Sequence, residues 1–378
     1  MHSDRAVNAQ RLAPPDPERA GALLSGALDA QGLSVHAYLS GDALRAALVA
    51  ARASNDLMIR YGAASASGCV AVALPYGEGL YSAPEWTKAW TEPQLEPRLE
   101  SWPESCTKSG CGFIPAALAR FVRADWYAEL ADRLAAAVAE TRTALAEEGM
   151  DPGPRSAWHR LSNSPLPERP VACAAGLGWI GRNGILVAGT AQRPCAAGSA
   201  VVLGLLFMPF APEGESQPSI AQVPAQFSGA QLSSEPIAGA AGATGDGRGL
   251  HCGSCRRCVD ACPTGALREG HFVREACIQH WSAIPGALPP EIEKAWGNRL
   301  YGCDLCLEAC PYFRPDPEAT AKRGMLGPAL PARFFVESGD ATVRETLRGT
   351  ALGLGWMHPA AFRRNAALAL RASASVSR

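Results

Sequence analysis

The clearest hydrophobic period along the chain predicts one long amphipathic helix, from about residue 126 to residue 148. Apolar side chains recur there about every 3.6 residues, which places them on one face of a helix. Asp125 directly precedes the helix and is its predicted N-cap. A shorter helix is predicted over residues 43–53, with Asp42 as its cap. The apolar positions of the long helix are Tyr127, Leu130, Leu134, Val138 and Leu145.

Three short apolar runs predict buried strands, at residues 69–75, 185–187 and 201–208. The last run lies within the longest apolar stretch, residues 199–212, which is shorter than the roughly 20 residues needed to cross a bilayer. Residues 213–249 are rich in Ala, Gly, Ser, Gln and Pro and show no period. This composition predicts a linker or a disordered insertion.

These elements predict the α+β class and an organisation in successive segments. The 378 residues suffice for two or three domains. Residues 1–34 are Ala-, Pro- and Gly-rich and are expected to be partly disordered, and residues 35–212 form the predicted first domain. Residues 250–315 form a cysteine-rich domain, and residues 316–378 a short helical C-terminal segment.

Composition and charge narrow the class of partner. Apolar residues make up 47% and charged residues 19%, and the net charge is −1, so the chain as a whole lacks the basic character of a nucleic-acid-binding protein. Residues 316–378 carry nine Lys and Arg against five Asp and Glu. Either this is a solvated surface, or Arg344, Arg348, Arg363 and Arg364 meet phosphates. We see no secretory or twin-arginine signal, so a cytoplasmic location without a membrane partner is expected.

Eight of the thirteen cysteines fall between residues 252 and 310. The first run has the spacing C-x2-C-x2-C-x3-C-P, and the second, C-x2-C-x3-C-P, lacks one cysteine that Cys277 can supply. This is the pattern of a bacterial ferredoxin with two 4Fe-4S clusters, in which the last cysteine of each run binds the other cluster. The prediction is therefore two ligand sets: Cys252, Cys255, Cys258 and Cys310 for one cluster, and Cys262, Cys277, Cys303 and Cys306 for the other.

Zinc is the alternative, because paired C-x2-C motifs also build zinc sites. Zinc explains the cysteine spacing less well, because a zinc site does not require a four-cysteine run that is repeated in part. In a chain with no visible export signal, clustered cysteines also favour metal over disulfides. The scattered cysteines are expected to be small buried residues: Cys69, Cys106, Cys111, Cys173 and Cys195.

Two clusters in series predict a path for electrons. A reduced ferredoxin or flavodoxin is the expected donor. More than 200 residues precede the clusters, which a stand-alone ferredoxin would not need. Either a substrate is reduced by that part of the chain, or the chain is an electron-transfer protein whose N-terminal domain only docks partners.

A glycine-rich segment, Gly176-x-Gly178-x-x-Gly181, matches the dinucleotide-binding pattern literally. That site also needs an acidic residue about 20 positions further on, and no Asp or Glu occurs between Glu168 and Glu213. Nicotinamide binding is therefore disfavoured. Two interpretations stay open: a tight turn in the core, or a turn that lets the backbone approach a large flat cofactor.

Three strings together resemble the epoxyqueuosine reductase family. They are Gly-Leu-Gly-Trp-Ile-Gly-Arg-Asn at 176–183, Cys-Gly-Ser-Cys-Arg-Arg-Cys-Val-Asp-Ala-Cys-Pro-Thr-Gly-Ala at 252–266, and Gly-Cys-Asp-Leu-Cys-Leu-Glu-Ala-Cys-Pro at 302–311. The resemblance extends over about residues 60–370. It implies a nitroreductase-like domain that binds cobalamin, and reduction of epoxyqueuosine to queuosine in tRNA. The residues that it suggests for cobalamin binding are Arg169, Gly176, Gly178, Gly181, Arg182 and Asn183.

One position departs from this family. Ser162 stands where the family's proposed proton donor, an aspartate, is expected, and a hydroxyl is a far weaker acid than a carboxyl group. Asp125, Tyr127 and Tyr61 are weak candidates for the proton donor in its place. Glu168 and Arg169 form either a structural ion pair near the cofactor or a direct contact with the cofactor. The segment after the clusters is also shorter than in many members. The alternative is therefore a related corrinoid iron–sulfur reductase that acts on a small molecule or a protein-bound corrinoid.

Overall fold

The computed structural model describes seven stretches of the chain: residues 12–77, 84–90, 114–189, 195–212, 251–268, 271–319 and 321–376. The linker predicted at 213–249, Cys106 and Cys111 lie outside them. The chain forms two compact units. The first comprises residues 1–74, 130–177 and 203–222, and the second residues 75–129, 178–202 and 223–378. This division is interleaved along the chain, unlike the successive segments predicted from the sequence.

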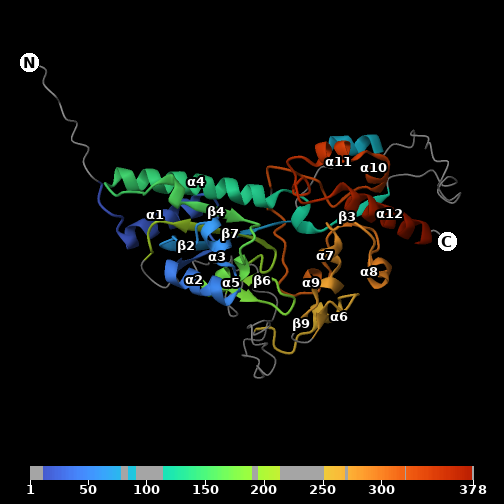
Figure 1. Ribbon diagram of the computed structural model, residues 1–378, viewed down its shortest axis with the longest axis horizontal. Coiled ribbons are helices and arrows are strands. Elements are labelled where there is room, and N and C mark those ends of the chain that lie inside the picture. Colours follow the sequence, from blue (N-terminus) through green and yellow to red (C-terminus); the bar gives the residue numbers. More distant parts are fainter. Residues whose placement is uncertain are drawn as a thin grey trace, which may run out of the picture. The chain divides into compact units, whose positions relative to one another are not determined.

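The first unit is built on a four-stranded sheet in the order β1-β2-β7-β4. β1 pairs antiparallel with β2, and β4 pairs antiparallel with β7. Figure 1 shows the long helix α4 running along this sheet. The strands and helices of the first unit are α1 (Pro17–Ala30), β1 (His36–Ser40), α2 (Gly41–Ala50), α3 (Asn55–Arg60), β2 (Gly68–Pro75), α4 (Trp126–Glu147), β4 (His159–Ser162), α5 (Glu168–Ala174) and β7 (Val201–Met208).

The predicted long helix and its cap agree with α4. The Oδ1 atom of Asp125 accepts a hydrogen bond from the backbone N–H of Ala128 at 3.0 Å, as an N-cap does. The apolar face packs on β7, where a Cβ atom at Gly204 would lie only 2.9 Å from Leu130 Cδ2. Tyr127 is half-buried, whereas Trp126 beside it is 1% exposed. Trp126 is thus a core residue that the period did not single out.

The predicted cap of the next helix is wrong. Ser40, not Asp42, caps α2: its hydroxyl accepts the N–H of Ala43 at 3.2 Å. Asp42 lies in the first turn and pairs with Arg45 at 2.6 Å. The helix dipole favours an acidic residue in the first turn even when that residue is not the cap. The sequence alone therefore does not distinguish a first-turn aspartate from an N-cap aspartate.

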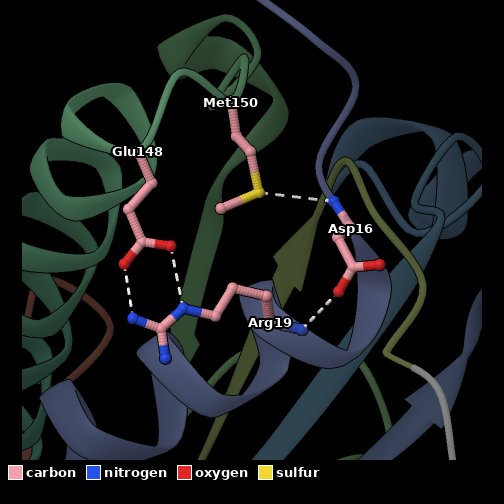
Figure 2. Close-up of polar contacts among 4 residues, drawn as sticks. All are labelled: Asp16, Arg19, Glu148 and Met150. Atoms are coloured by element: carbon pink, nitrogen blue, oxygen red, sulfur yellow. Dashed lines mark hydrogen bonds and ion pairs between the residues drawn. The ribbon is translucent and has the colours of Figure 1, made fainter.

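Part of the N-terminal segment expected to be disordered is helical. In α1 the Oδ1 atom of Asp16 accepts the N–H of Arg19 at 2.8 Å and caps the helix. Figure 2 shows the Arg19 guanidinium against the carboxylate of Glu148, with Nε–Oε2 at 2.8 Å, and Met150 Sδ accepting the N–H of Asp16. One face of α1 is buried, at Ala20, Leu24, Ala27 and Leu28.

The second unit has a small sheet in the order β10-β3-β11. β3 (Pro115–Leu118) pairs parallel with β10 (Arg299–Tyr301) and antiparallel with β11 (Ala329–Pro331). The C-terminal helix α12 (Pro359–Val376) packs on β10 and on α10 (Ala332–Glu337). An aromatic core that includes Tyr301, Phe334, Phe335 and Phe362 joins them. The helical C-terminal segment predicted from the sequence is thus present.

No helix among the described residues is both long and apolar enough to span a membrane.

Candidate iron–sulfur centre

The two cysteine runs fold in the same way. Each places a cysteine on a one-turn helix, Cys258 on α6 (Arg257–Asp260) and Cys306 on α9 (Leu305–Glu308). The last cysteine of each run follows the helix directly and bonds back to it: the N–H of Cys262 reaches Val259 O at 3.2 Å, and that of Cys310 reaches Leu307 O at 2.8 Å. The helices α6 and α9 pack against each other, so the two runs face one another as a pair.

One set of thiols gathers around Cys258. Burial, followed by the nearby thiolates of Cys252, Cys310 and Cys255, raises the pKa of Cys258 to about 11. The pKa of Cys310 is likewise raised, first by burial and then by Cys252 and Cys255. These four residues form what we call the first thiol group. They are the set predicted for one cluster.

A second set gathers around Cys306. Burial and then the charges of Cys303, Cys277, Cys258 and Cys262 raise the pKa of Cys306 to about 12. We call Cys262, Cys277, Cys303 and Cys306 the second thiol group, which is the other predicted set. Because most of these thiols hold their protons tightly and a metal binds only the thiolate, loading a cluster must release protons.

Cys262 is the exception, because its pKa is lowered. Burial alone would raise it, but the backbone N–H groups of Leu267, Thr264 and Ala266 and the Thr264 hydroxyl favour the thiolate more strongly. The hydroxyl Oγ1 lies 3.6 Å from Cys262 Sγ. The Cys-Pro-Thr-Gly-Ala turn therefore stabilises the thiolate form of Cys262.

Zinc and a four-iron cluster differ in how they take their ligands. A structural zinc ion needs four ligands on one centre, whereas a four-iron cluster takes its four cysteines separately. Within the described residues, no three His, Cys, Asp or Glu side chains converge closely enough to hold a single metal ion. Which cysteine binds which cluster stays a prediction.

The glycine-rich segment is a helix end followed by a hairpin. Gly176, with φ +76°, terminates α5, and its N–H bonds to Cys173 O while that of Leu177 bonds to Ala172 O, both at 2.9 Å, a Schellman-type end. β5 (Gly178–Ile180) then pairs antiparallel with β6 (Leu186–Ala188). A Cβ atom at Gly178 would lie 2.1 Å from Val187 O. Contacts within the chain therefore account for these glycines.

The tip of this hairpin contacts the cysteine segments. The backbone N–H of Arg182 points to Cys252 Sγ at 3.4 Å, and Arg182 Nη2 donates to Gly253 O at 2.7 Å. The neighbouring Asn183 donates from Nδ2 to Cys306 O at 3.4 Å. The sequence predicted Arg182 and Asn183 as cobalamin-binding residues, which stays a prediction, and the structure places them beside Cys252 and the backbone of Cys306. Nothing local in the sequence signals contacts that span 70 and 123 residues.

Two buried N–H donors near the first thiol group have no acceptor among the described residues: Trp179 Nε1 and Arg182 Nε. The Trp179 ring packs edge-on against His251 and Tyr312, with centroids 5.3 and 5.4 Å apart. His251 precedes Cys252, and Tyr312 follows Cys310 by two residues. Cluster sulfurs accept such hydrogen bonds, so these orphaned donors suit a 4Fe-4S cluster at the first thiol group.

Strand β4 in the first unit ends at Ser162, the position that departs from the family. Its hydroxyl is buried and has no hydrogen-bond partner in the part of the chain that the structure describes. Asn163 follows with φ 54°. Six residues after Ser162, the carboxylate of Glu168 accepts the N–H of Ser164 at 2.9 Å, and burial raises the pKa of Glu168 to about 6. Arg169 is exposed on α5.

The other weak candidates for proton donation occupy structural places. Asp125 caps α4, Tyr61 is the half-buried residue at the end of α3, and Tyr127 is half-buried in α4. Of the scattered cysteines, Cys69 and Cys195 are buried, as predicted, and Cys173 is half-buried.

Three of the four C-terminal arginines, Arg348, Arg363 and Arg364, are engaged within the second unit. Arg364 donates to Ile284 O and Gly286 O at 2.7 and 2.8 Å. Arg363 pairs with Asp340 at 2.6 Å, and Arg348 pairs with Glu345. Arg364 therefore holds the fold together and is not a free phosphate ligand.

Residues 251–312 match the family described as the 4Fe-4S double cluster binding domain. The chain therefore carries a binding domain for two iron–sulfur clusters. Among curated proteins it is similar to epoxyqueuosine reductase of Bacillus anthracis, with 29% identity over 54% of this chain and 45% of the relative. It is also similar to that of Xanthomonas campestris, with 28% identity over 52% of this chain and 50% of the relative. The chain thus spans about half the length of these curated relatives.

Solved structures extend the likeness over most of the chain. Epoxyqueuosine reductase from Streptococcus thermophilus superposes with a TM-score of 0.61 at 19% identity, covering 93% of this chain and 81% of that one. A structure of epoxyqueuosine reductase with an epoxyqueuosine-modified tRNA stem loop gives 0.57 at 20% identity, covering 93% and 82%. The Bacillus subtilis enzyme, solved with its aspartate catalytic loop swung out of the active site, gives 0.56 at 21%, covering 95% and 84%. The α+β prediction is confirmed, and the chain is related to the epoxyqueuosine reductases and has their fold.

Proposed function

We propose that this protein is a cobalamin-dependent iron–sulfur reductase that converts epoxyqueuosine to queuosine in tRNA in the cytoplasm. The observation that carries the proposal is the pairing of two thiol groups with the fold of the epoxyqueuosine reductases. The tRNA substrate is inferred from the relative solved with a modified stem loop. A reduced ferredoxin or flavodoxin is the proposed donor.

The reaction sets what the chain must supply. Removing the epoxide oxygen as water takes two electrons and two protons. Each 4Fe-4S cluster passes one electron at a time, so two clusters in series suit a stepwise two-electron reduction. Cobalamin, when bound, would supply a low-potential cobalt nucleophile. The residues proposed to hold it are Arg169, Gly176, Gly178, Gly181, Arg182 and Asn183, of which Arg182 and Asn183 also contact the cysteine segments.

The proton source is the step at which this chain differs. Ser162 carries no carboxyl group, whereas a Bacillus subtilis relative is described with an aspartate catalytic loop. Glu168 begins α5, six residues after Ser162, and is partly protonated near pH 6, where a general acid works well. We therefore propose Glu168 as the carboxyl group that supplies the proton.

A tRNA assay tests the proposal. The chain is expressed in a bacterium that lacks its own epoxyqueuosine reductase, and both nucleosides are measured in bulk tRNA by mass spectrometry. Queuosine should replace epoxyqueuosine. Persistent epoxyqueuosine, with the protein soluble and carrying about eight irons per chain as two clusters require, would contradict it. A Cys277→Ala variant is the negative control.

Ser162 favours a second candidate, a paralogue that uses the same cofactors on a small molecule or on a protein-bound corrinoid. Such an enzyme would bind cobalamin but leave epoxyqueuosine unchanged. Cobalt content after anaerobic incubation with cobalamin separates both from the third hypothesis, an electron-transfer protein without its own catalysis, which would bind no cobalamin.

A further inference from the structure

We propose that Arg182 raises the reduction potential of the cluster held by the first thiol group, through its backbone N–H and its guanidinium charge. The proposal rests on the two clusters and not on the substrate. Its failure is therefore distinguishable from failure of the tRNA assay.

The geometry brings both parts of Arg182 to this group. Its N–H lies 3.4 Å from Cys252 Sγ, and its Nη2 atom is fixed 2.7 Å from the carbonyl of the next residue, Gly253. The Nε–H is buried and has no acceptor in the described part of the chain. The residue therefore offers a hydrogen bond to a ligand sulfur, a positive charge held one residue away, and a donor not yet used.

The redox step explains why these features raise the potential. Reduction adds one electron to the cluster from an external one-electron donor, and no covalent bond forms or breaks. The reduced cluster is more negative by one charge. A fixed cation and N–H···S hydrogen bonds stabilise that added charge more than they stabilise the oxidised cluster.

The β5–β6 hairpin contacts the two thiol groups in different ways. Asn183 meets the second group only through the amide-to-carbonyl contact with Cys306 at 3.4 Å, which places no charge there. Arg299 lies on β10, four residues before Cys303 of the second group, and donates to Ala295 O at 3.2 Å. Arg182 should therefore act on one cluster and Arg299 on the other.

The test compares variants of the full chain with both clusters reconstituted. The potentials are measured anaerobically by titration with dithionite and mediators, followed by electron paramagnetic resonance. A Cys277→Ala background, which removes the second cluster, assigns the signals. Arg182→Gln should shift the first cluster's reduction equilibrium about tenfold toward the oxidised form, or 59 mV for a one-electron couple.

The controls isolate the charge. Arg182→Lys keeps a cation and should shift the equilibrium less than about threefold. Arg256→Gln removes a charge beside Cys255 from a side chain that is 45% exposed and paired with Asp260 at 3.7 Å, so solvent screening should make its effect equally small. Arg299→Gln should move only the second cluster.

Two results would overturn the proposal. One is an unchanged first-cluster potential in Arg182→Gln at full iron content, and the other is an equal shift in the Gln and Lys variants. If the Gln variant does not hold iron, Arg182→His replaces it, because its imidazole is charged only at low pH. Its first-cluster potential should then rise from pH 8 to pH 5.5 more than that of the wild type, and an identical pH dependence would refute the role of charge.

Discussion

The two regions that the proposed reaction needs differ in how many of the required chemical groups they contain. The cysteine region has eight thiols in two groups, hydrogen bonds to Cys262, and a hairpin tip that touches both groups. At the β4–α5 connection, Ser162 at the end of β4 has a hydroxyl without a partner among the described residues, and the nearest carboxyl group along the chain is that of Glu168 at the start of α5. The proposed electron path therefore uses the cysteines of the matching double cluster binding domain, whereas the proposed proton donor is not at the position of the family's aspartate. The predictions below test each side of this contrast.

The largest effect is expected in the cysteine region. Cys277→Ala should lower iron from about eight to about four per chain, because one cluster loses a ligand that no other cysteine of the region replaces. Cys173→Ala, at a half-buried cysteine outside both groups, should keep all the iron. Iron and sulfide analysis measures this, and unchanged iron in Cys277→Ala would refute the assignment.

The hydrophobic support of the second thiol group gives the next effect. Trp296 is fully buried beside Ile278 and Ile292, in a cluster against which Cys303 packs. Trp296→Ala should cost about 3–5 kcal/mol of unfolding free energy. Trp356→Ala, at a side chain 57% exposed, should change it by less than about 0.5 kcal/mol. Equal losses in denaturant titrations would contradict the packing described.

Restoring an acid at the changed position tests proton delivery. Ser162→Asp should raise the rate of epoxyqueuosine reduction by up to about 10²-fold, the lower end of what a general acid contributes, because it adds a carboxyl group at the family's position to the one proposed at Glu168. Ser162→Asn is the matched control, because it has similar size but no acidic proton, and should give no gain. Single-turnover assays with reduced protein measure both. A gain in both variants would mean that shape, not acidity, limits the reaction.

The raised pKa of Glu168 predicts a pH dependence of stability. The folded state holds this proton up to about pH 6, whereas the unfolded chain releases it near pH 4.5, so the folded state binds more protons between these values. The stabilisation is complete below pH 4.5 and is lost as the pH rises through 6, by about 2 kcal/mol. Glu168→Gln should remove this dependence. Parallel pH profiles of the wild type and the variant in denaturant titrations would contradict it.

The smallest effect concerns Asp125, the other carboxyl group suggested for proton donation. As the cap of α4, Asp125→Ala should cost about 1 kcal/mol and leave the chemical step unchanged. Asp42→Ala, at a side chain 96% exposed that caps nothing, should cost less than about 0.5 kcal/mol. A large loss of single-turnover rate in Asp125→Ala would return this residue to the proton path.

Local patterns in the sequence predicted the parts of the molecule that depend on neighbours in the chain. Cysteine spacing predicted a binding domain for two clusters, and the 3.6-residue period with Asp125 predicted α4. The misses at the cysteine region are long-range. β3 pairs with strands about 180 and 210 residues away, and Arg182 meets Cys252 across 70 residues. No local pattern encodes such pairings, so the hairpin's role at the thiol groups emerged only from the fold.

The most direct test of the account uses the purified chain, reconstituted with iron, sulfide and cobalamin and reduced with dithionite. It is mixed under anaerobic conditions with a tRNA stem loop that carries epoxyqueuosine, and the nucleosides are counted by mass spectrometry. The proposed function predicts slow conversion to queuosine by the wild type and faster conversion by Ser162→Asp. No queuosine from either protein, with both clusters and cobalamin bound, would contradict it.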